Sequence, residues 1–495
     1  ESFPTYDVTG HVLLLSSGVW RSEEYVDQSL WSHFLTIIEP DNVTSDTALL
    51  LITGGDTGVS PAPPVYLLPF AQATGSVVAV VQAVPNQPAT FSDETTSRSE
   101  DALLAYTFDQ FMNEYEDMPD NAADVTWPAL LPMTRAAVRA MDALQEFVSS
   151  DEKPGSPITI DEFVLAGASK RGWTTWLTAA TDDRVAAIMP IVSDVLNLDD
   201  QVRHQRQAYS TYESTDPENA IVEGFSDALQ PYVDLDVFER IDTLAGYSLR
   251  RIIDPIYYTA RLTMPKFIIN STGDQFFLPD STQFYWDRLL GENRLYYAAN
   301  TDHGLTGSSE LDVDTQSLNA MLAYYTGYIY NTNDDPEDDV TIPQLDWVFR
   351  GDTRVDVWTN VEPNAVSLWQ AVNREHRDFR LEAIGEEWED TDLIERTTKR
   401  AGCRIDLPEN VYTLLGFTHD VDGDGALTPE EAAAFADPEL WAMADSDPQD
   451  GAISLDEFLG MPEPYEELLG LDRHVDNVIS PGELQSAGDA AQAAF

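Results

Sequence analysis

The sequence is poor in lysine and nearly without cysteine. Its 495 residues include only four lysines, Lys153, Lys170, Lys266 and Lys399, and the single cysteine is Cys403. One cysteine excludes a disulfide within the chain, so the stability of the fold does not depend on oxidation. No uninterrupted apolar run reaches about 18 residues, which argues against a membrane-spanning helix in these residues.

Positive charge is scarce as well, with 27 basic residues against 87 acidic ones and a formal net charge of −60. This balance leaves no basic surface that could neutralise phosphates, and so argues against nucleic acid and anionic membranes as partners. A hydrophobic fraction of 43% and 11 tryptophans indicate a folded core beneath the acidic surface. An acid-rich, lysine-poor surface suits high salt, and we expect a halophilic protein, although calcium binding is another reason for some of the acid.

Short β-rich runs alternate with helical stretches from about residue 48 onward. The runs ALLLITGG, SVVAVVQAV and ITIDEFVLAGAS are followed by others at 185–192, 267–270 and 294–299. This alternation predicts an α/β fold with a parallel, doubly wound sheet and crossover helices. The pattern breaks over about 197–262 into polar, helix-like sequence, which we interpret as a helical cap that covers the substrate.

A charged, proline-containing segment, NTNDDPEDD, follows a helix-like stretch that ends near residue 330. Such a segment is typical of a linker, so we predict a catalytic domain over residues 1–332. Alternating apolar and polar residues predict a small β-sandwich domain over 340–400. Acidic, glycine-punctuated loops between short helices predict a third module over 405–490.

The segment FVLAGASKRGWTTWLTAA places Ser169 between a β-rich run and a helix, which is the context of a nucleophile elbow. Gly167 fits the tight turn, but the glycine usual at the second position after the serine is displaced to Gly172. A lone serine in such a turn is more often structural than nucleophilic, so a catalytic role for Ser169 requires a histidine and an acid as partners.

Two partners follow later in the chain. Asp274 lies on the loop after the run at 267–270, and His303 lies on the loop after the run at 294–299. The order Ser, Asp, His is that of α/β-hydrolases. A helix cap at Asp274 and a turn residue at His303 are the alternatives. We favour a catalytic triad in which His303 takes the proton of Ser169 and Asp274 fixes the tautomer of the histidine.

The developing oxyanion of such a reaction needs two hydrogen-bond donors. We expect the backbone N–H of Lys170 to be the first and that of Gly54 or Gly55 to be the second. Lys170 and Arg171 also place two of the few cations at a helix N-terminus. This placement favours an anionic substrate group or transition state, and salt bridges to nearby acids are the equal alternative.

Several long segments resemble one known family. They are VPNQPATF with EDALLAYTFDQF (83–112), LPMTRAAVRAMDAL (131–144), GASKRGWTTWLTAATDDRVAAIMPIVSDVLN (167–197), PKFIINSTGDQFFLPDS (265–281) and LWQAVNREHRDFR (368–380). Over roughly residues 5–400 the chain resembles the PhoPQ-activated pathogenicity-related proteins. The resemblance implies an α/β-hydrolase fold similar to prolyl dipeptidyl peptidases and glucuronoyl esterases. At least one relative is regarded as a secreted signal, so the family leaves the substrate open.

The acidic tail contains a complete EF-hand loop, DVDGDGALTPEE, with hard oxygen ligands at alternating positions and a final bidentate glutamate. DRHVDNVISPGE repeats the spacing less well, and DSDPQDGAISLDE fits with one extra residue. The predicted ligands of the three loops are Asp420, Asp422, Asp424, Ala426, Glu431, Asp445, Asp447, Asp450, Glu457, Asp472, His474, Asp476, Val478 and Glu483. We expect two or three structural calcium ions.

These observations predict a secreted or periplasmic serine hydrolase, an esterase or peptidase, that acts on a small-molecule ester or peptide. The N-terminal ESFPTYDV has no charged-then-apolar leader, and we interpret it as a mature end after cleavage. The calcium tail is also a candidate for attachment to a cell surface or polysaccharide. The alternative is a secreted signalling or binding protein on a catalytically idle hydrolase fold.

Overall fold

The computed structural model describes most of the first 392 residues. The described ranges are 2–3, 7–62, 64–117, 124–151, 153–209, 221–308, 313–332, 343, 345–349, 355–362, 366–374 and 376–392. Residues 1–393 form one compact unit. The predicted EF-hand module at 405–490 lies outside the described residues, so its three loops stay predictions.

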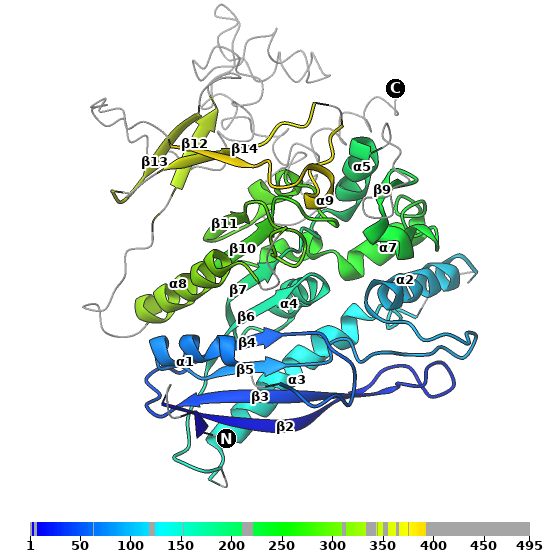
Figure 1. Cartoon of the computed structure of the whole chain (residues 1–495). Helices are drawn as coiled ribbons and strands as arrows, with labels where there is room; N and C mark the ends of the chain where they lie inside the picture. The colour runs from blue at the N-terminus through cyan, green and yellow to red at the C-terminus, as the bar shows by residue number, and fades with distance from the viewer. Residues whose placement is uncertain are drawn as a thin grey trace, which may run out of the picture. The chain divides into compact units, whose positions relative to one another are not determined.

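A nine-stranded sheet with the order β1-β2-β3-β5-β4-β6-β7-β10-β11 forms the centre of this unit (Figure 1). Its strands are β1 (Ser2–Phe3), β2 (Val8–Val19), β3 (Leu30–Pro40), β4 (Thr47–Ile52), β5 (Val78–Val81), β6 (Glu162–Ala168), β7 (Val185–Ile191), β10 (Lys266–Ser271) and β11 (Asn293–Ala298). The strands from β5 to β11 along the sheet pair in parallel, whereas β1, β2, β3 and β5 pair antiparallel. The sheet is therefore mixed rather than purely parallel.

The parallel strands coincide with the β-rich runs of the sequence. β4 and β5 are buried along their whole length, as expected for parallel strands that are covered on both faces. Strands β2 and β3 precede residue 48 and were not predicted. The sequence of β2, VTGHVLLLSSGV, has no clean alternation of apolar and polar residues, and its Val12 and Leu14 are 56% and 75% exposed.

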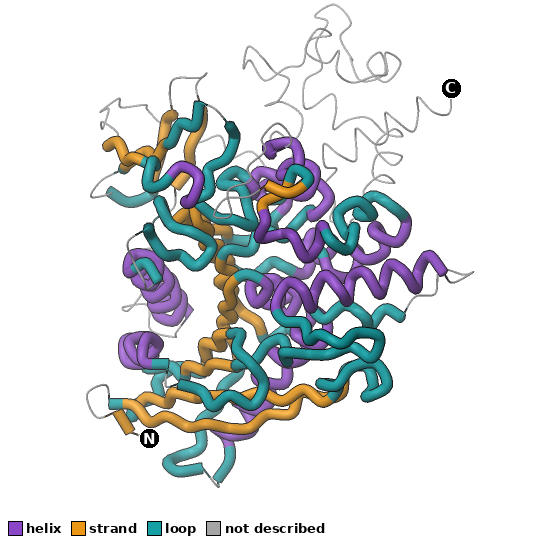
Figure 2. Tube along the Cα trace, turned by 45° about the vertical axis from the view of Figure 1, so that its right-hand side comes forward, coloured by secondary structure: helices purple, strands orange, loops and turns teal. Residues whose placement is uncertain are grey.

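Helices cover both faces of the sheet (Figure 2). The helices α2 (Glu100–Asp117), α3 (Leu130–Ser149) and α4 (Lys170–Thr181) belong to one hydrophobic cluster, and α1 (Leu68–Thr74) and α8 (Thr315–Thr332) to another. Alternate residues of β4 face the two clusters, because Leu50 packs in the first and Leu49 and Leu51 in the second. Within the described ranges, no helix combines the length and the hydropathy needed to cross a membrane.

A mostly helical segment is inserted between β7 and β10, where the sequence analysis places the cap. Its described α-helices and strands are α5 (Leu198–Tyr209), β8 (Ile221–Val222), β9 (Phe225–Ser226), α6 (Gln230–Val233) and α7 (Leu244–Ile253). Residues of this insertion, among them Phe225, Tyr232 and Leu249, are buried in the same cluster as α2 and α4. The insertion is therefore packed onto the helices beside Ser169.

The β-sandwich predicted over 340–400 is not confirmed. The described part of this segment contains two separate antiparallel pairs, β12 (Leu345–Phe349) with β13 (Val355–Thr359), and β14 (Ser367–Gln370) with β15 (Glu389–Asp392), together with the short helix α9 (Leu381–Ile384). This stretch belongs to the same compact unit as the large sheet. Polar contacts described below connect it to the candidate site.

Candidate active site

Ser169 occupies a sharp turn between β6 and α4. Its backbone has φ 56° and ψ −126°, a combination that side-chain-bearing residues rarely adopt and that costs roughly 1–3 kcal/mol. Hydrogen bonds hold the turn, since the Ser169 N–H donates to the Ile191 carbonyl at 2.8 Å and the Ser169 carbonyl accepts from the Trp173 N–H at 3.0 Å. A strained strand-to-helix turn of this kind presents the serine hydroxyl at the end of the sheet.

The displaced glycine of the motif has a packing reason. A Cβ atom at Gly172 would lie 2.6 Å from the Cβ of Ser193, and one at Gly167 would lie 2.5 Å from the carbonyl oxygen of Arg171. Both distances are shorter than real side chains tolerate, so glycine is required at both positions for α4 to start so close to the sheet. The glycine that lets the helix pack closely against the sheet therefore stands at the third position after the serine, whereas in the usual motif it stands at the second.

Asp274 and His303 meet at the ends of the adjacent parallel strands β10 and β11. The Nδ1 atom of His303 lies 2.8 Å from both carboxylate oxygens of Asp274. Asp274 is buried, and its Oδ1 also accepts hydrogen bonds from the N–H groups of Phe276 at 2.7 Å and Phe277 at 3.2 Å. These bonds fix the carboxylate, which in turn orients the imidazole.

The other ring nitrogen of His303, Nε2, is buried and has no hydrogen-bond partner among the described residues. The ring packs against Phe276, with centroids 4.3 Å apart. Phe276 and Ser169 line the same cavity. Because Nδ1 donates to Asp274, Nε2 carries the lone pair that a general base needs. His303 itself is not among the described residues that line the cavity, and its ring reaches the wall through Phe276.

The cations after Ser169 are paired with carboxylates. Lys170 Nζ lies 2.9 Å from Glu100 and 3.0 Å from Asp101. Arg171 holds Glu100 through two hydrogen bonds of 2.6 and 2.7 Å and donates from Nε to the Val84 carbonyl. Burial alone would raise the pKa of Glu100, but Arg171 and Lys170 outweigh it and hold this pKa well below its usual range. The sequence left two roles for these cations, binding of an anionic substrate group and salt bridges to nearby acids, and the salt bridges are present.

The two expected oxyanion donors follow the carboxyl ends of the neighbouring parallel strands β4 and β6. Lys170 is the first residue of α4, where a backbone N–H has no partner within the helix. Gly55, with φ 105°, follows β4, and Ile52 at the end of β4 pairs with Gly167 at the end of β6. The loop that carries Gly55 therefore begins beside the Ser169 turn.

Four supporting residues, Glu100, Asp101, Gln275 and Glu382, were missed by the sequence analysis. Glu100 and Asp101 are paired with the cations described above. Gln275 accepts a hydrogen bond from the His303 backbone N–H at 2.9 Å and donates to Glu382 at 2.9 Å. In addition, the Leu381 N–H donates to the Gly273 carbonyl at 3.0 Å. The segment around α9 thus contacts the Asp274 loop directly and the His303 loop through Gln275.

A further buried carboxyl, Asp194, lines the cavity after β7. It accepts hydrogen bonds from the side chains of Asn270, at 3.0 Å, and Tyr285. Burial raises the pKa of Asp194 to about 7. In the ranges that the structure describes, no cluster of histidine, cysteine and acidic residues is arranged to hold a metal ion.

Comparison with known proteins decides the family. The family model of the PhoPQ-activated pathogenicity-related proteins matches residues 1–380. The chain belongs to this family. It is 37% identical over 390 residues to autocrine proliferation repressor protein A of Dictyostelium discoideum, a match that covers 75% of this chain and 71% of the relative. The resemblance found in the sequence is thus confirmed.

Solved structures with some likeness to this member of the PhoPQ-activated family include an esterase and a peptidase. Acetyl xylan esterase from Paenibacillus sp. R4 has a TM-score of 0.39 and 14% identity, with 64% of this chain and 88% of that chain covered. Acylaminoacyl peptidase from Pyrococcus horikoshii has a TM-score of 0.40 and 12% identity, with 66% and 44% covered. The chain thus matches less than half the length of that peptidase.

Proposed function

We propose that this protein is an α/β-hydrolase that cleaves an ester or amide bond, with Ser169 as nucleophile, His303 as base and Asp274 as the group that orients the histidine. The observation that carries the proposal is the buried Nε2 of His303. Asp274 fixes the ring so that this nitrogen is the proton acceptor, and the aromatic residue packed on the ring lines the same cavity as Ser169.

The proposed reaction gives each of these residues one role. As the Ser169 hydroxyl attacks the carbonyl carbon, its proton passes to Nε2 of His303, and the imidazolium is stabilised by Asp274. The imidazolium then gives this proton to the leaving alcohol or amine, and a water molecule activated in the same way releases the acyl group. The N–H groups of Lys170 and Gly55 would stabilise the oxyanion, each by roughly 3–4 kcal/mol.

The name of the Dictyostelium relative favours a second candidate function. A proliferation repressor acts on cells, so this chain would be a signalling or binding protein on a hydrolase fold. Such a protein has no need for a reactive serine. The chemical reactivity of Ser169 therefore separates the two candidates.

Covalent labelling tests the proposal. We expect a fluorophosphonate probe to modify the wild type at Ser169 and to leave Ser169→Ala unmodified, as shown by intact mass and peptide mapping. Ser193→Ala is a matched control, because Ser193 is a buried serine on the neighbouring β7 loop whose hydroxyl has no partner among the described residues. This control should be labelled like the wild type. A wild type that stays unlabelled would contradict the hydrolase function and favour the signalling candidate.

We also propose that the tail binds calcium, that the protein is secreted or periplasmic, and that it works in saline surroundings. Isothermal titration of the full chain with calcium tests the first of these. Glu431→Gln removes a bidentate ligand and should weaken the affinity of the loop at 420–431 at least about tenfold. Glu430→Gln changes the neighbouring acid, which is not at a ligand position, and should bind normally. Equal affinities of the two variants would speak against the EF-hand.

A further inference from the structure

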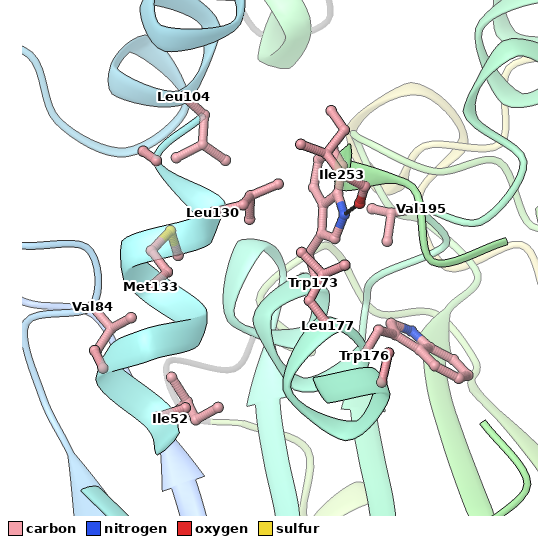
Figure 3. Packing of buried hydrophobic residues seen from close by; sticks show 14 of the residues in the cluster. Ile52, Val84, Leu104, Leu130, Met133, Trp173, Trp176, Leu177, Val195 and Ile253 are labelled. Atoms are coloured by element: carbon pink, nitrogen blue, oxygen red, sulfur yellow. Dashed lines mark hydrogen bonds between the residues drawn. The ribbon is translucent and has the colours of Figure 1, made fainter. Parts of the chain in front are cut away.

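The cavity that contains Ser169 has an apolar lining. The cavity has a volume of about 90 Å³ and lies between α4, the β7 loop and the inserted segment. Trp173, Val195 and Ile253 lie together in its wall, and Figure 3 shows their side chains in one group. The indole N–H of Trp173 donates to the Ile253 carbonyl at 2.5 Å, so the ring presents only apolar atoms to the cavity.

The charged side chains that line the cavity in the described ranges are all engaged with protein partners. Lys170 is held between Glu100 and Asp101. Asp101 also accepts a hydrogen bond from the Tyr232 hydroxyl at 2.9 Å. Asp194 is engaged with the side chains behind it, as described above. Because Lys170 and Arg171 balance the two acids that they contact, this cluster offers no net charge to an anionic or a cationic substrate.

Two uncharged polar side chains in the wall, Gln201 and Gln205, are bonded to backbone carbonyls. Gln201 donates to the carbonyls of Leu196 at 3.2 Å and Ser281 at 3.1 Å. Gln205 donates to the Phe276 carbonyl at 3.2 Å. A polar substrate group would have to compete with these bonds, whereas an apolar group would only displace water.

We infer that the substrate presents a bulky, neutral, apolar group to this cavity, beside the bond that is cleaved. The inference rests on the hydrolase function proposed above and names its substrate class: neutral esters or amides with a large hydrocarbon or aromatic acyl group. Sugar acids, other anionic acyl groups and substrates held by a free amine are the classes that the cavity disfavours.

Hydrolysis of three p-nitrophenyl esters tests this inference. The acetate is small, the hexanoate is long and neutral, and the mono-ester of adipic acid has the length of the hexanoate with a terminal carboxylate. We expect kcat/KM for the hexanoate to exceed that for the acetate at least about tenfold, and to exceed that for the adipate by a similar factor. Equal values for the three esters, or a preference for the adipate, would overturn the inference.

A substitution that fills the cavity locates the effect. Val202 of α5 lines the cavity, whereas Gln207 of the same helix is exposed. We expect Val202→Trp to lower the hexanoate-to-acetate ratio of kcat/KM about tenfold, while Gln207→Trp keeps the wild-type ratio. An unchanged ratio in a Val202→Trp protein with a wild-type circular dichroism spectrum would place the acyl group elsewhere and overturn the inference.

The labelling experiment separates failure of this inference from failure of the proposed function. A wild type whose Ser169 reacts with the fluorophosphonate, but which shows no preference for the hexanoate, is a hydrolase with another substrate class. If the wild type neither reacts with the probe nor cleaves any of the esters, both the hydrolase function and the inferred substrate class are contradicted.

Discussion

Replacing His303 by alanine is expected to lower kcat for p-nitrophenyl ester hydrolysis by about 10⁵- to 10⁶-fold, provided that Ser169 is the nucleophile. Without Nε2 nothing accepts the proton of the hydroxyl, and a neutral serine is a weak nucleophile at neutral pH. The structure supplies the geometric reason, since the His303 ring is fixed by Asp274 and packed on Phe276. Steady-state kinetics of both proteins measure this ratio of kcat values. Titration of the wild type with the fluorophosphonate probe gives its concentration of active sites.

The variant Asp274→Asn should lower kcat by about 10⁴-fold for a different reason. An asparagine amide can donate to Nδ1, which moves the ring proton to Nε2 and removes the acceptor. The fold should persist, because the side-chain oxygen can still accept from the N–H groups of Phe276 and Phe277. Burst kinetics should therefore show slow acylation rather than loss of protein.

A second His–Asp pair serves as the matched control. His204 of α5 lies 2.8 Å from Asp280 through its Nε2, and neither residue belongs to the proposed triad. We expect His204→Ala to keep kcat within a few-fold of the wild type. A His303→Ala protein that retains more than about 1% of the wild-type kcat would show that His303 is not the base.

The three catalytic residues could be proposed from the sequence because each follows a β-rich run. The runs before Ser169, Asp274 and His303 are β6, β10 and β11, which are parallel members of one sheet. Parallel strands end at the same edge, so chain order was enough to bring these loops together. The displaced glycine made the motif weaker, and only the close approach of Gly172 to Ser193 explains it.

The partners of the cations could not be found in this way. Glu100 is 71 residues from Arg171 in the sequence, and the chain has 87 acidic residues from which to choose. Neither periodicity nor spacing marks one of them, because the pairing depends on how α2 packs beside α4. Glu382 was missed for a related reason. The charged segment NTNDDPEDD was interpreted as a linker, so the residues after it were assigned to a separate domain. In the structure, Leu381 and Glu382 contact the Asp274 loop.

Arg171→Met is expected to lower the free energy of unfolding by about 2–3 kcal/mol, the largest stability effect that the site predicts. Arg171 is 8% exposed, and its guanidinium satisfies both oxygens of Glu100 and the Val84 carbonyl. Methionine fills a similar volume but leaves the carboxylate without its bidentate partner. We place the loss below the 3–5 kcal/mol typical of fully buried pairs, because the Glu100 side chain is 42% exposed and water screens it.

Urea unfolding in calcium-containing buffer measures this loss, and two further variants show its origin. Arg139→Met breaks an exposed pair with Asp142, whose side chains are 57% and 38% exposed, and should cost less than about 1 kcal/mol. Adding Glu100→Gln to Arg171→Met should recover part of the loss, because an unpaired amide is less costly to desolvate than an unpaired carboxylate. If the double variant is instead less stable than Arg171→Met by the full cost of Glu100→Gln alone, the pair contributes nothing of its own. The pairing with Lys170 and the backbone contact of Arg171 would then account for the stability of the turn that carries Ser169.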